Sequence, residues 1–292
     1  MSATPATPRM IGSAHEERRF TMPESSREAD APLSRALLLA RGALEAEPAG
    51  LLTDFDGTLS PIVHDPFMAG LVDGAHGALS ALAERLAVVA IVTGRMPLDA
   101  RRLVGVPGLL IAGNHGTEWL DPGADEPSVA PDAERIGRAV EAALERVPAI
   151  PGVRTDHKGV SASVHYRQAA DPDAARTEIL GALGDLEPLG LKIGEGRMIV
   201  EIRAAALGDK GTAARELVER FGLRGALVMG DDVTDLDMFA AIAELRAAGR
   251  VRAAIIAVGG SDHEVAPEVT AAADVVLATP AEAAELLDRL SR

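Results

Sequence analysis

Short apolar runs that end abruptly in polar residues recur along the chain, and each predicts a buried strand. They occupy residues 49–54, 87–92, 109–112, 225–229, 251–258 and 274–277. Segments with apolar residues at helical spacing alternate with them, at 32–45, 74–86, 209–221 and 281–291 and after Pro97. Continuous apolar strands that alternate with helices are typical of a parallel sheet covered on both faces. The pattern therefore predicts an α/β fold with a doubly wound, Rossmann-like parallel sheet.

The pattern changes between residues 121 and 205. A stretch rich in Pro, Gly and Asp at 121–131 indicates a hinge, and the segment after it reads as a helix, two strands, a helix and two strands. The expected ranges are 132–147, 153–158, 161–167, 172–186, 190–194 and 197–203, with turns at Lys158-Gly159 and Glu195-Gly196. Alternating strands joined by tight turns predict a small antiparallel sheet backed by helices. We expect this α+β module to be a cap domain inserted into the core.

These patterns divide the chain into four segments. Residues 1–30 mix Pro, Ser, Thr and charged residues without a hydrophobic period, so we expect a disordered leader there. Residues 31–120 are expected to form the first part of the core, beginning with a helix that docks on it. Residues 121–205 are the expected cap, and residues 206–292 complete the core.

Composition narrows the classes of function. The 292 residues are 47% hydrophobic but only 2% aromatic, so Ala, Leu, Val and Ile must build the interior. The absence of cysteine excludes disulfides, thiolate nucleophiles and cysteine-bound metals. A net charge of −15 argues against a nucleic-acid or anionic-membrane partner. The sequence has no apolar run of membrane-spanning length and no secretion signal, so we expect a cytoplasmic protein without a membrane partner.

The first predicted strand ends in two acids. Asp54 and Asp56 are separated by one residue, and because alternate strand residues share a face, both can point to one site. Gly57 allows the backbone to turn sharply beside a ligand. Two carboxylates held together repel each other unless a cation joins them, and Mg²⁺ prefers oxygen ligands of this kind. The alternative interpretation is an acid-rich turn after an ordinary strand.

Two further polar motifs also come directly after predicted strands. They are Thr93-Gly94-Arg95 and Asp231-Asp232. In open α/β sheets ligands bind at the carboxyl edge, where motifs distant in sequence can converge. Taken alone, Thr-Gly-Arg can be a structural turn, and Lys210 at a predicted helix start can be a solvated lysine. The agreement of several independent motifs is what favours a functional site.

The acidic run at 230–237 has a second interpretation, a calcium-binding loop. Such a loop needs Gly at its sixth position and Glu at its twelfth. Counted from Asp231, the twelfth residue is Ile242 and the sixth is not Gly. We therefore expect Asp231 and Asp232 to be available for a metal, with Thr234 or Asp235 capping the next helix.

In their order along the chain, these motifs resemble the four motifs of the haloacid-dehalogenase-like (HAD) phosphatases. The matching residues are Asp54-Phe55-Asp56-Gly57-Thr58, Thr93-Gly94-Arg95, Lys210 and Gly230-Asp231-Asp232-Val233-Thr234-Asp235. Finer details are similar to the trehalose-6-phosphate phosphatase family within this superfamily. They are Ser60-Pro61-Ile62, Gly113-Asn114-His115-Gly116, His157-Lys158-Gly159, His165-Tyr166-Arg167 and Val200-Glu201-Ile202-Arg203. The resemblance begins near Gly50, and Ala204-Ala205-Ala206 departs from it where the family often has Pro, which leaves the hinge geometry open.

The resemblance implies a Mg²⁺-dependent phosphatase that works through an aspartyl-phosphate. Asp54 would attack phosphorus, and Asp56 would protonate the leaving sugar oxygen and then deprotonate the attacking water. Thr93, the Gly94 N–H and Lys210 would hold the phosphoryl oxygens. The implied metal ligands are Asp54, Asp231 and the backbone carbonyl of Asp56, with Asp232 acting through a water.

The implied reaction is hydrolysis of trehalose 6-phosphate, the last step of trehalose biosynthesis. The substrate-binding residues that the resemblance implies are Asn114, His115, Lys158 and Glu201. A phosphatase for another sugar phosphate, of the sucrose-phosphate or mannosyl type, remains an alternative, as does a related phosphomutase. A catalytically inactive sugar-phosphate sensor is the alternative from a different class. The expected partner is a small sugar phosphate, and the oligomeric state stays open, with a monomer slightly favoured.

Overall fold

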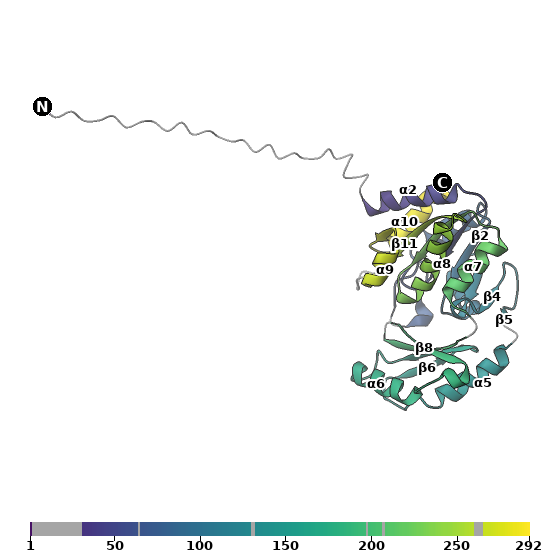
Figure 1. The fold of residues 1–292 in the computed structure, drawn as a ribbon, viewed down its shortest axis with the longest axis vertical. Helices are drawn as coiled ribbons and strands as arrows, with labels where there is room; N and C mark the ends of the chain where they lie inside the picture. Colours follow the sequence, from purple (N-terminus) through teal and green to yellow (C-terminus); the bar gives the residue numbers. More distant parts are fainter. Residues whose placement is uncertain (2–30, 64, 130–131, 197, 206–207, 260–264) are drawn as a thin grey trace.

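The protein consists of a core and a cap, shown in the upper and lower halves of the ribbon in Figure 1. The computed structural model describes Met1 and residues 31–292, apart from 64, 130–131, 197, 206–207 and 260–264. Apart from Met1, the predicted leader lies outside the described residues, as does part of the Ala-rich segment after Arg203.

A single eight-stranded sheet organises the core. Its strands follow the order β12 (Val275–Leu277), β11 (Arg252–Val258), β10 (Gly225–Gly230), β1 (Ala49–Thr53), β2 (Val88–Val92), β3 (Leu110–Gly113), β4 (Glu118–Leu120) and β5 (Ser128–Val129). The first six pair in parallel, and β4 and β5 add an antiparallel edge. Every residue of β1, β2, β3 and β10 is buried, which is why these strands read as continuous apolar runs. The doubly wound parallel sheet predicted from the sequence is confirmed.

Helices cover both faces of this sheet. One face carries α2 (Pro32–Leu44), α3 (Ala75–Ala83), α4 (Pro97–Val104) and α10 (Pro280–Ser291), and the other carries α7 (Lys210–Arg220), α8 (Leu236–Ala247) and α9 (Pro267–Ala272). The predicted docking helix is α2, which packs on β10, β11 and β12 through Ala36, Ala40 and Ala43. None of the helices that the structure describes is long and apolar enough to cross a membrane.

The cap is a four-stranded antiparallel sheet with two helices. Its strand order is β6 (Arg154–His157), β7 (Ser161–His165), β9 (Ile199–Ala204) and β8 (Leu191–Gly196), and its helices are α5 (Ala133–Leu144) and α6 (Pro172–Leu183). The helices cover the sheet face that points away from the core (Figure 1), and a separate apolar cluster lies beneath them. The predicted order of helices and strands is confirmed, and the other sheet face is left to meet the core.

Three local features differ from the expectations. The core sheet continues through β4 and β5 as far as Val129, beyond the expected domain boundary at residue 121. Strands of three and two residues are too short to show an alternating pattern, and the Pro- and Gly-rich segment conceals them. The six-residue α9 was not expected either, and β8 runs on to Gly196, where a turn was predicted.

Candidate active site

The expected site residues converge at the carboxyl edge of the core sheet. The strands β10, β1 and β2 are neighbours, and Asp231, Asp54 and Thr93 come directly after them. All three side chains are buried. This is the edge at which open α/β sheets bind ligands.

Gly57 explains how two of these loops approach each other so closely. Its φ of 83° lies in the left-handed region, and a Cβ placed on it would fall 1.9 Å from Asp231 Oδ2. A side chain at this position would therefore displace the Asp231 carboxylate. The hydroxyl of Thr58 next to it donates to Asp231 Oδ1 at 3.0 Å and fixes that carboxylate.

Three acids and one lysine form the centre of the site. Oxygens of Asp54, Asp231 and Asp235 lie within 4.8 Å of one another. Lys210, which begins α7 and is 2% exposed, places Nζ 3.0 Å from Asp54 Oδ2 and 2.7 Å from Asp235 Oδ1. A buried lysine needs such partners because an unpaired charge in the interior is strongly unfavourable.

The protonation of this cluster reflects its burial. Burial raises the pKa of Asp54 to about 8, Lys210 opposes the rise, and Asp235 and Asp56 add to it. Burial, with Asp54 as the next cause, also raises the pKa of Asp231 well above its usual range. Burial acts against the charge of Lys210, but Asp235 and Asp54 prevail and raise its pKa. Lys210 therefore stays charged. Its single positive charge does not offset the effect of burial on the pKa values of Asp54 and Asp231.

The donor set fits a hard divalent cation. Asp54 and Asp231 are buried carboxylates at close range, and burial is the main cause of their raised pKa values. A cation between them would stabilise both negative charges. Asp235 is less available, because Oδ1 accepts from Lys210 and Oδ2 accepts the N–H groups of Asp231 and Asp232, at 3.0 and 3.1 Å. An acidic cluster that can bind a metal is therefore present.

The side chains of two of the expected metal ligands, Asp232 and Asp56, are not part of this cluster. The carboxylate of Asp232 caps the short η4 helix (Val233–Asp235) by accepting from Val233 N–H at 2.7 Å, and it is not one of the three converging acids. Asp56 was expected to use its backbone carbonyl, and its side chain also lies apart from the cluster. The sequence interpretation assigned the cap of the next helix to Thr234 or Asp235, whereas Asp232 and Asp235 together form a capping box.

Asp56 is held by an arginine. Arg95 Nε and Nη2 donate to its Oδ2 and Oδ1, at 2.6 and 2.7 Å. This two-point contact fixes the plane of the carboxylate, as bidentate arginine pairs do. Sequence reasoning left the role of Arg95 open, although its place two residues after Thr93, at the end of the strand beside β1, was the available signal.

The Thr93-Gly94 loop lies between core and cap. Thr93 Oγ1 accepts the Arg95 N–H at 3.2 Å, and Gly94 O accepts from Lys158 Nζ of the cap at 3.1 Å. A Cβ on Gly94 would lie 2.7 Å from His115 Cε1, so only glycine allows the imidazole to pack here. The structure thus brings together these four expected site residues: Thr93, Gly94, His115 and Lys158.

The cap supplies Glu201 on β9. Its Oε1 lies 3.1 Å from His115 Nε2, and Arg203 Nε lies 3.8 Å from its Oε2, beyond hydrogen-bond distance. Burial lowers the pKa of His115, which makes the ring neutral at pH 7, so that Nε2–H donates to Glu201. Burial acts against the charge of Glu201, but His115, Arg203 and Lys158 together lower its pKa. The carboxylate therefore stays ionised.

Three buried atoms between the core and the cap lack a hydrogen-bond partner among the described residues. They are His115 Nδ1, Glu201 Oε2 and Arg203 Nε. We call the set His115, Glu201 and Arg203 the seam. Because buried polar atoms in native proteins are nearly always paired, orphan atoms between core and cap indicate where a polar ligand binds.

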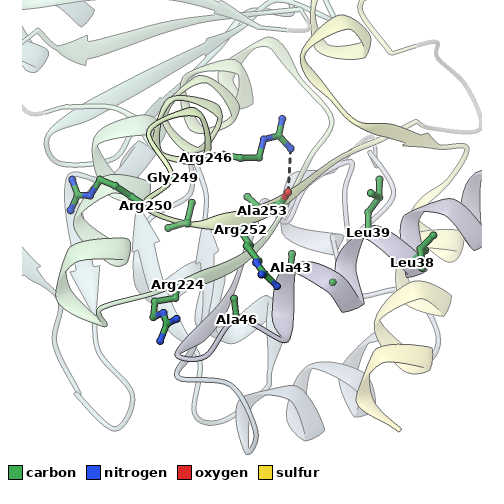
Figure 2. A pocket seen from close by; sticks show the side chains of 12 residues that line it. Leu38, Leu39, Ala43, Ala46, Arg224, Arg246, Gly249, Arg250, Arg252 and Ala253 are labelled. Atoms are coloured by element: carbon green, nitrogen blue, oxygen red, sulfur yellow. Dashed lines mark hydrogen bonds between the residues drawn. The ribbon is translucent and has the colours of Figure 1, made fainter.

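A hollow of about 650 Å³ lies elsewhere, between α2 and the start of β11 (Figure 2). Figure 2 shows Arg224, Arg246, Arg250 and Arg252 around it, with Arg246 donating to Ala253 O at 3.2 Å. Arg252 is the first residue of β11, so the hollow is at the sheet edge opposite the acidic cluster. Its described lining contains neither an acid nor a nucleophile, and it is not the active site.

Comparisons with known proteins agree with this geometry. The family model for trehalose-phosphatase matches residues 52–272. A trehalose-phosphate phosphatase of Mycobacterium tuberculosis is 34% identical over 267 residues, 88% of this chain and 65% of that protein. An uncharacterized glycosyl hydrolase of the same species is 40% identical over 200 residues, 65% of this chain and 15% of that protein. This chain thus spans less than two thirds of the length of either relative.

A solved structure extends the agreement to the fold. The C-terminal domain of the trehalose-6-phosphate phosphatase of Candida albicans superposes with a TM-score of 0.70, over 88% of this chain and 96% of that chain. The two sequences are 23% identical, so this likeness concerns the fold. Core and cap are both covered by the matches.

Proposed function

Because the chain belongs to the trehalose-phosphatase family, we propose that it hydrolyses trehalose 6-phosphate to trehalose and phosphate, the last step of trehalose biosynthesis. The observation that carries the chemistry is the buried contact of Asp54 with Lys210 beside Asp231, at the carboxyl edge of the sheet. A carboxylate nucleophile, a fixed cation and a metal-binding acid are the parts that phosphoryl transfer requires.

In the first half-reaction an oxygen of Asp54 bonds to phosphorus while the bond from phosphorus to the sugar oxygen breaks. Asp54 Oδ1 already accepts the Phe55 N–H at 2.7 Å, which fixes the direction of the carboxylate. Lys210 stabilises the negative charge that accumulates around phosphorus, together with Thr93 and the Gly94 N–H. The product of this step is trehalose and an aspartyl-phosphate.

Asp56 moves the protons in both halves of the reaction. It gives a proton to the leaving sugar oxygen and then takes one from the water that attacks the aspartyl-phosphate, which returns Asp54 and releases phosphate. Arg95 donates to both carboxylate oxygens of Asp56, so these oxygens are already engaged before a substrate binds. The first half-reaction therefore needs this pair to loosen when substrate binds.

Mg²⁺ is the proposed cofactor. Asp54 and Asp231 are the side chains that would hold it, with the backbone carbonyl of Asp56 and, through water, Asp232. When bound, the ion offsets the repulsion between the Asp54 carboxylate and the phosphate. The close approach of Asp54 and Asp231 supports this assignment.

The seam supports a sugar as the group attached to phosphate. Sugar hydroxyls both donate and accept hydrogen bonds, so one disaccharide can satisfy Nδ1 of His115, Oε2 of Glu201 and Nε of Arg203. Lys158, which reaches across to Gly94, adds a cation beside the loop of Thr93 and Gly94, which we call the phosphate-binding loop.

We further propose a cytoplasmic location and a monomer slightly favoured over an oligomer.

The test is phosphate release from a panel of sugar phosphates by the full chain, with Mg²⁺ or with excess chelator. The panel contains trehalose 6-phosphate, sucrose 6-phosphate, a mannosyl phosphate and glucose 6-phosphate. We expect the highest kcat/KM for trehalose 6-phosphate and no activity in chelator. A higher kcat/KM for another sugar phosphate of the panel would assign that compound as the substrate. If none of the four compounds released phosphate in a metal-dependent way, the proposed phosphatase function would be wrong.

A further inference from the structure

Asn114 is an expected sugar ligand, but its amide is already engaged. Asn114 is 2% exposed in η2 (Asn114–Gly116), at the end of β3. Its Nδ2 donates to Glu118 Oε2 at 2.6 Å and to the backbone oxygen of Lys158 at 3.0 Å, while Oδ1 accepts from Ser161 Oγ at 2.7 Å. An amide has two N–H donors, and both are used here. Asn114 therefore has no donor left for a sugar hydroxyl.

The orientation of this amide follows from its surroundings. A carboxylate and a backbone carbonyl can only accept, so the NH₂ group must face Glu118 and Lys158. The oxygen then faces Ser161, whose hydroxyl can donate. Glu118 and Ser161 are each 6% exposed, so water does not compete strongly for these bonds. Burial raises the pKa of Glu118, and the hydrogen bond from Asn114 opposes that rise.

These bonds join two domains. Asn114 and Glu118 belong to the core, whereas Lys158 and Ser161 are the two ends of the cap turn between β6 and β7, which the Lys158 N–H closes on Ser161 O at 2.8 Å. Gly159 in this turn has a φ of 75°. The same turn projects the Lys158 side chain onto Gly94 of the phosphate-binding loop. Asn114 of the core therefore contacts the turn at both ends, through the backbone oxygen of Lys158, whose side chain reaches the loop, and through the hydroxyl of Ser161.

We propose that Asn114, Glu118 and Ser161 form a clasp that sets the Lys158 turn of the cap against the phosphate-binding loop. The three are positioning residues and not sugar ligands, and their effect on the reaction is exerted through Lys158. The proposal rests on the proposed function, because it assumes that the cap reads the sugar portion of the substrate. Without the clasp the turn visits other positions, and the apparent affinity for a disaccharide phosphate falls with the fraction of time that Lys158 is in place.

The first experiment compares two substrates in three variants of the full chain. Ser161→Ala removes one bond of the clasp, and Ser161→Thr keeps the hydroxyl. Ser128→Ala is the control, because it deletes an exposed hydroxyl that donates to the backbone of Trp119 in the core strand β4 and not to the clasp. We expect Ser161→Ala to lower kcat/KM for trehalose 6-phosphate about five- to tenfold, mostly through KM, as the loss of one hydrogen bond does. Ser161→Thr should restore it, and hydrolysis of p-nitrophenyl phosphate should stay within about twofold.

The second experiment asks whether the effect passes through Lys158. In a Lys158→Ala background, Ser161→Ala should cause no further loss, since residues that act as one unit are not additive. An equal additional loss in that background, or an equal loss for both substrates, would overturn the clasp and assign Ser161 to general stability. Glu118→Gln, which keeps an acceptor oxygen for Asn114, should retain more activity than Glu118→Ala.

Hydrogen exchange separates failure of the clasp from failure of the proposed function. Amides of residues 158–162 should exchange faster in Ser161→Ala than in the parent and in Ser128→Ala. Unchanged exchange overturns the clasp, whatever the substrate. If the parent does not hydrolyse trehalose 6-phosphate, the proposed function fails, and faster exchange in the variant still supports the clasp.

Discussion

The acidic centre of the core and the seam between core and cap differ in how far their buried polar atoms are satisfied. In the centre, Lys210 contacts both Asp54 and Asp235, and the second oxygen of Asp235 accepts two backbone N–H groups. In the seam, one buried atom in each of His115, Glu201 and Arg203 has no hydrogen-bond partner among the described residues. The three unpaired atoms are themselves buried, so exposure to solvent does not explain the difference.

The contrast separates chemistry from recognition. Charged groups that act on a transition state work best when they are fixed in advance, so the centre is complete in its protein contacts apart from the metal. A recognition site must keep hydrogen-bond donors and acceptors free for its ligand. The seam keeps three such atoms, although leaving buried polar atoms unpaired is unfavourable in the absence of a ligand. Changes in the centre should therefore impair every substrate, whereas changes in the seam should impair only the disaccharide.

The largest effect is expected for Asp54→Asn. An amide cannot form the aspartyl-phosphate, so turnover of both trehalose 6-phosphate and p-nitrophenyl phosphate should fall by more than about 10⁴-fold. Circular dichroism and Tm should show a folded protein, and Asp73→Asn, an exposed acid, is the matched control. Near-normal phosphate release from folded Asp54→Asn would remove Asp54 as the nucleophile.

Lys210→Met should be the next most severe change. Loss of the cation should lower kcat for both substrates about 10²–10³-fold, a common result when an electrostatic stabiliser is removed. It also leaves Asp235 unpaired and should destabilise the fold by about 3–5 kcal/mol. The double variant Lys210→Met/Asp235→Asn should recover Tm but not activity. If activity returned with Tm, Lys210 would serve only the fold.

Glu201→Gln tests whether a change in the seam impairs only the disaccharide substrate. Loss of a charged hydrogen-bond partner should reduce kcat/KM for trehalose 6-phosphate about 10–100-fold. Hydrolysis of p-nitrophenyl phosphate, which has no sugar, should fall far less. Glu195→Gln is a suitable control, since Glu195 pairs with Arg176 on the exposed face of the cap. Equal losses for the two substrates would contradict the division between centre and seam.

The smallest expected effect is on how the free energy of unfolding and the binding of Mg²⁺ depend on pH. Without metal, the raised pKa values of Asp54, about 8, and of Asp231 mean that the folded state holds protons that the unfolded state has released. These two groups make their full contribution to the free energy of unfolding at about pH 4, and this contribution declines as the pH rises toward 8. Mg²⁺ must displace the same protons, so it should bind more tightly at pH 8 than at pH 5.5.

Scanning calorimetry measures this dependence. The rise in Tm on adding Mg²⁺ should be larger at pH 8 than at pH 5.5, by about 2–4 °C for each kcal/mol of additional binding free energy. Asp231→Asn should reduce the rise at both pH values. An equal Mg²⁺ effect at the two pH values in the parent protein would argue against a metal held by these acids.

Hydrophobic pattern made the order of elements predictable, because strands buried on both faces need uninterrupted apolar residues. It predicted β1, β2 and β10, and with them the edge at which Asp54, Thr93 and Asp231 meet. It did not predict β4, β5 or α9, which are too short to show a period. Their formation depends on neighbours already in place, β3 in the case of β4.

The sequence by itself determined which chemical groups are present and which strand end carries each, since both follow from residue type and from period. Only the tertiary structure decided which partner each group has. Asp235, and not Asp232, joins Asp54 and Asp231, and Arg95 holds Asp56. The amide of Asn114 meets the cap turn rather than open space. Hydrogen bonds act over about 3 Å and in fixed directions, and a separation of 44 residues, as between Asn114 and Lys158, carries no such information.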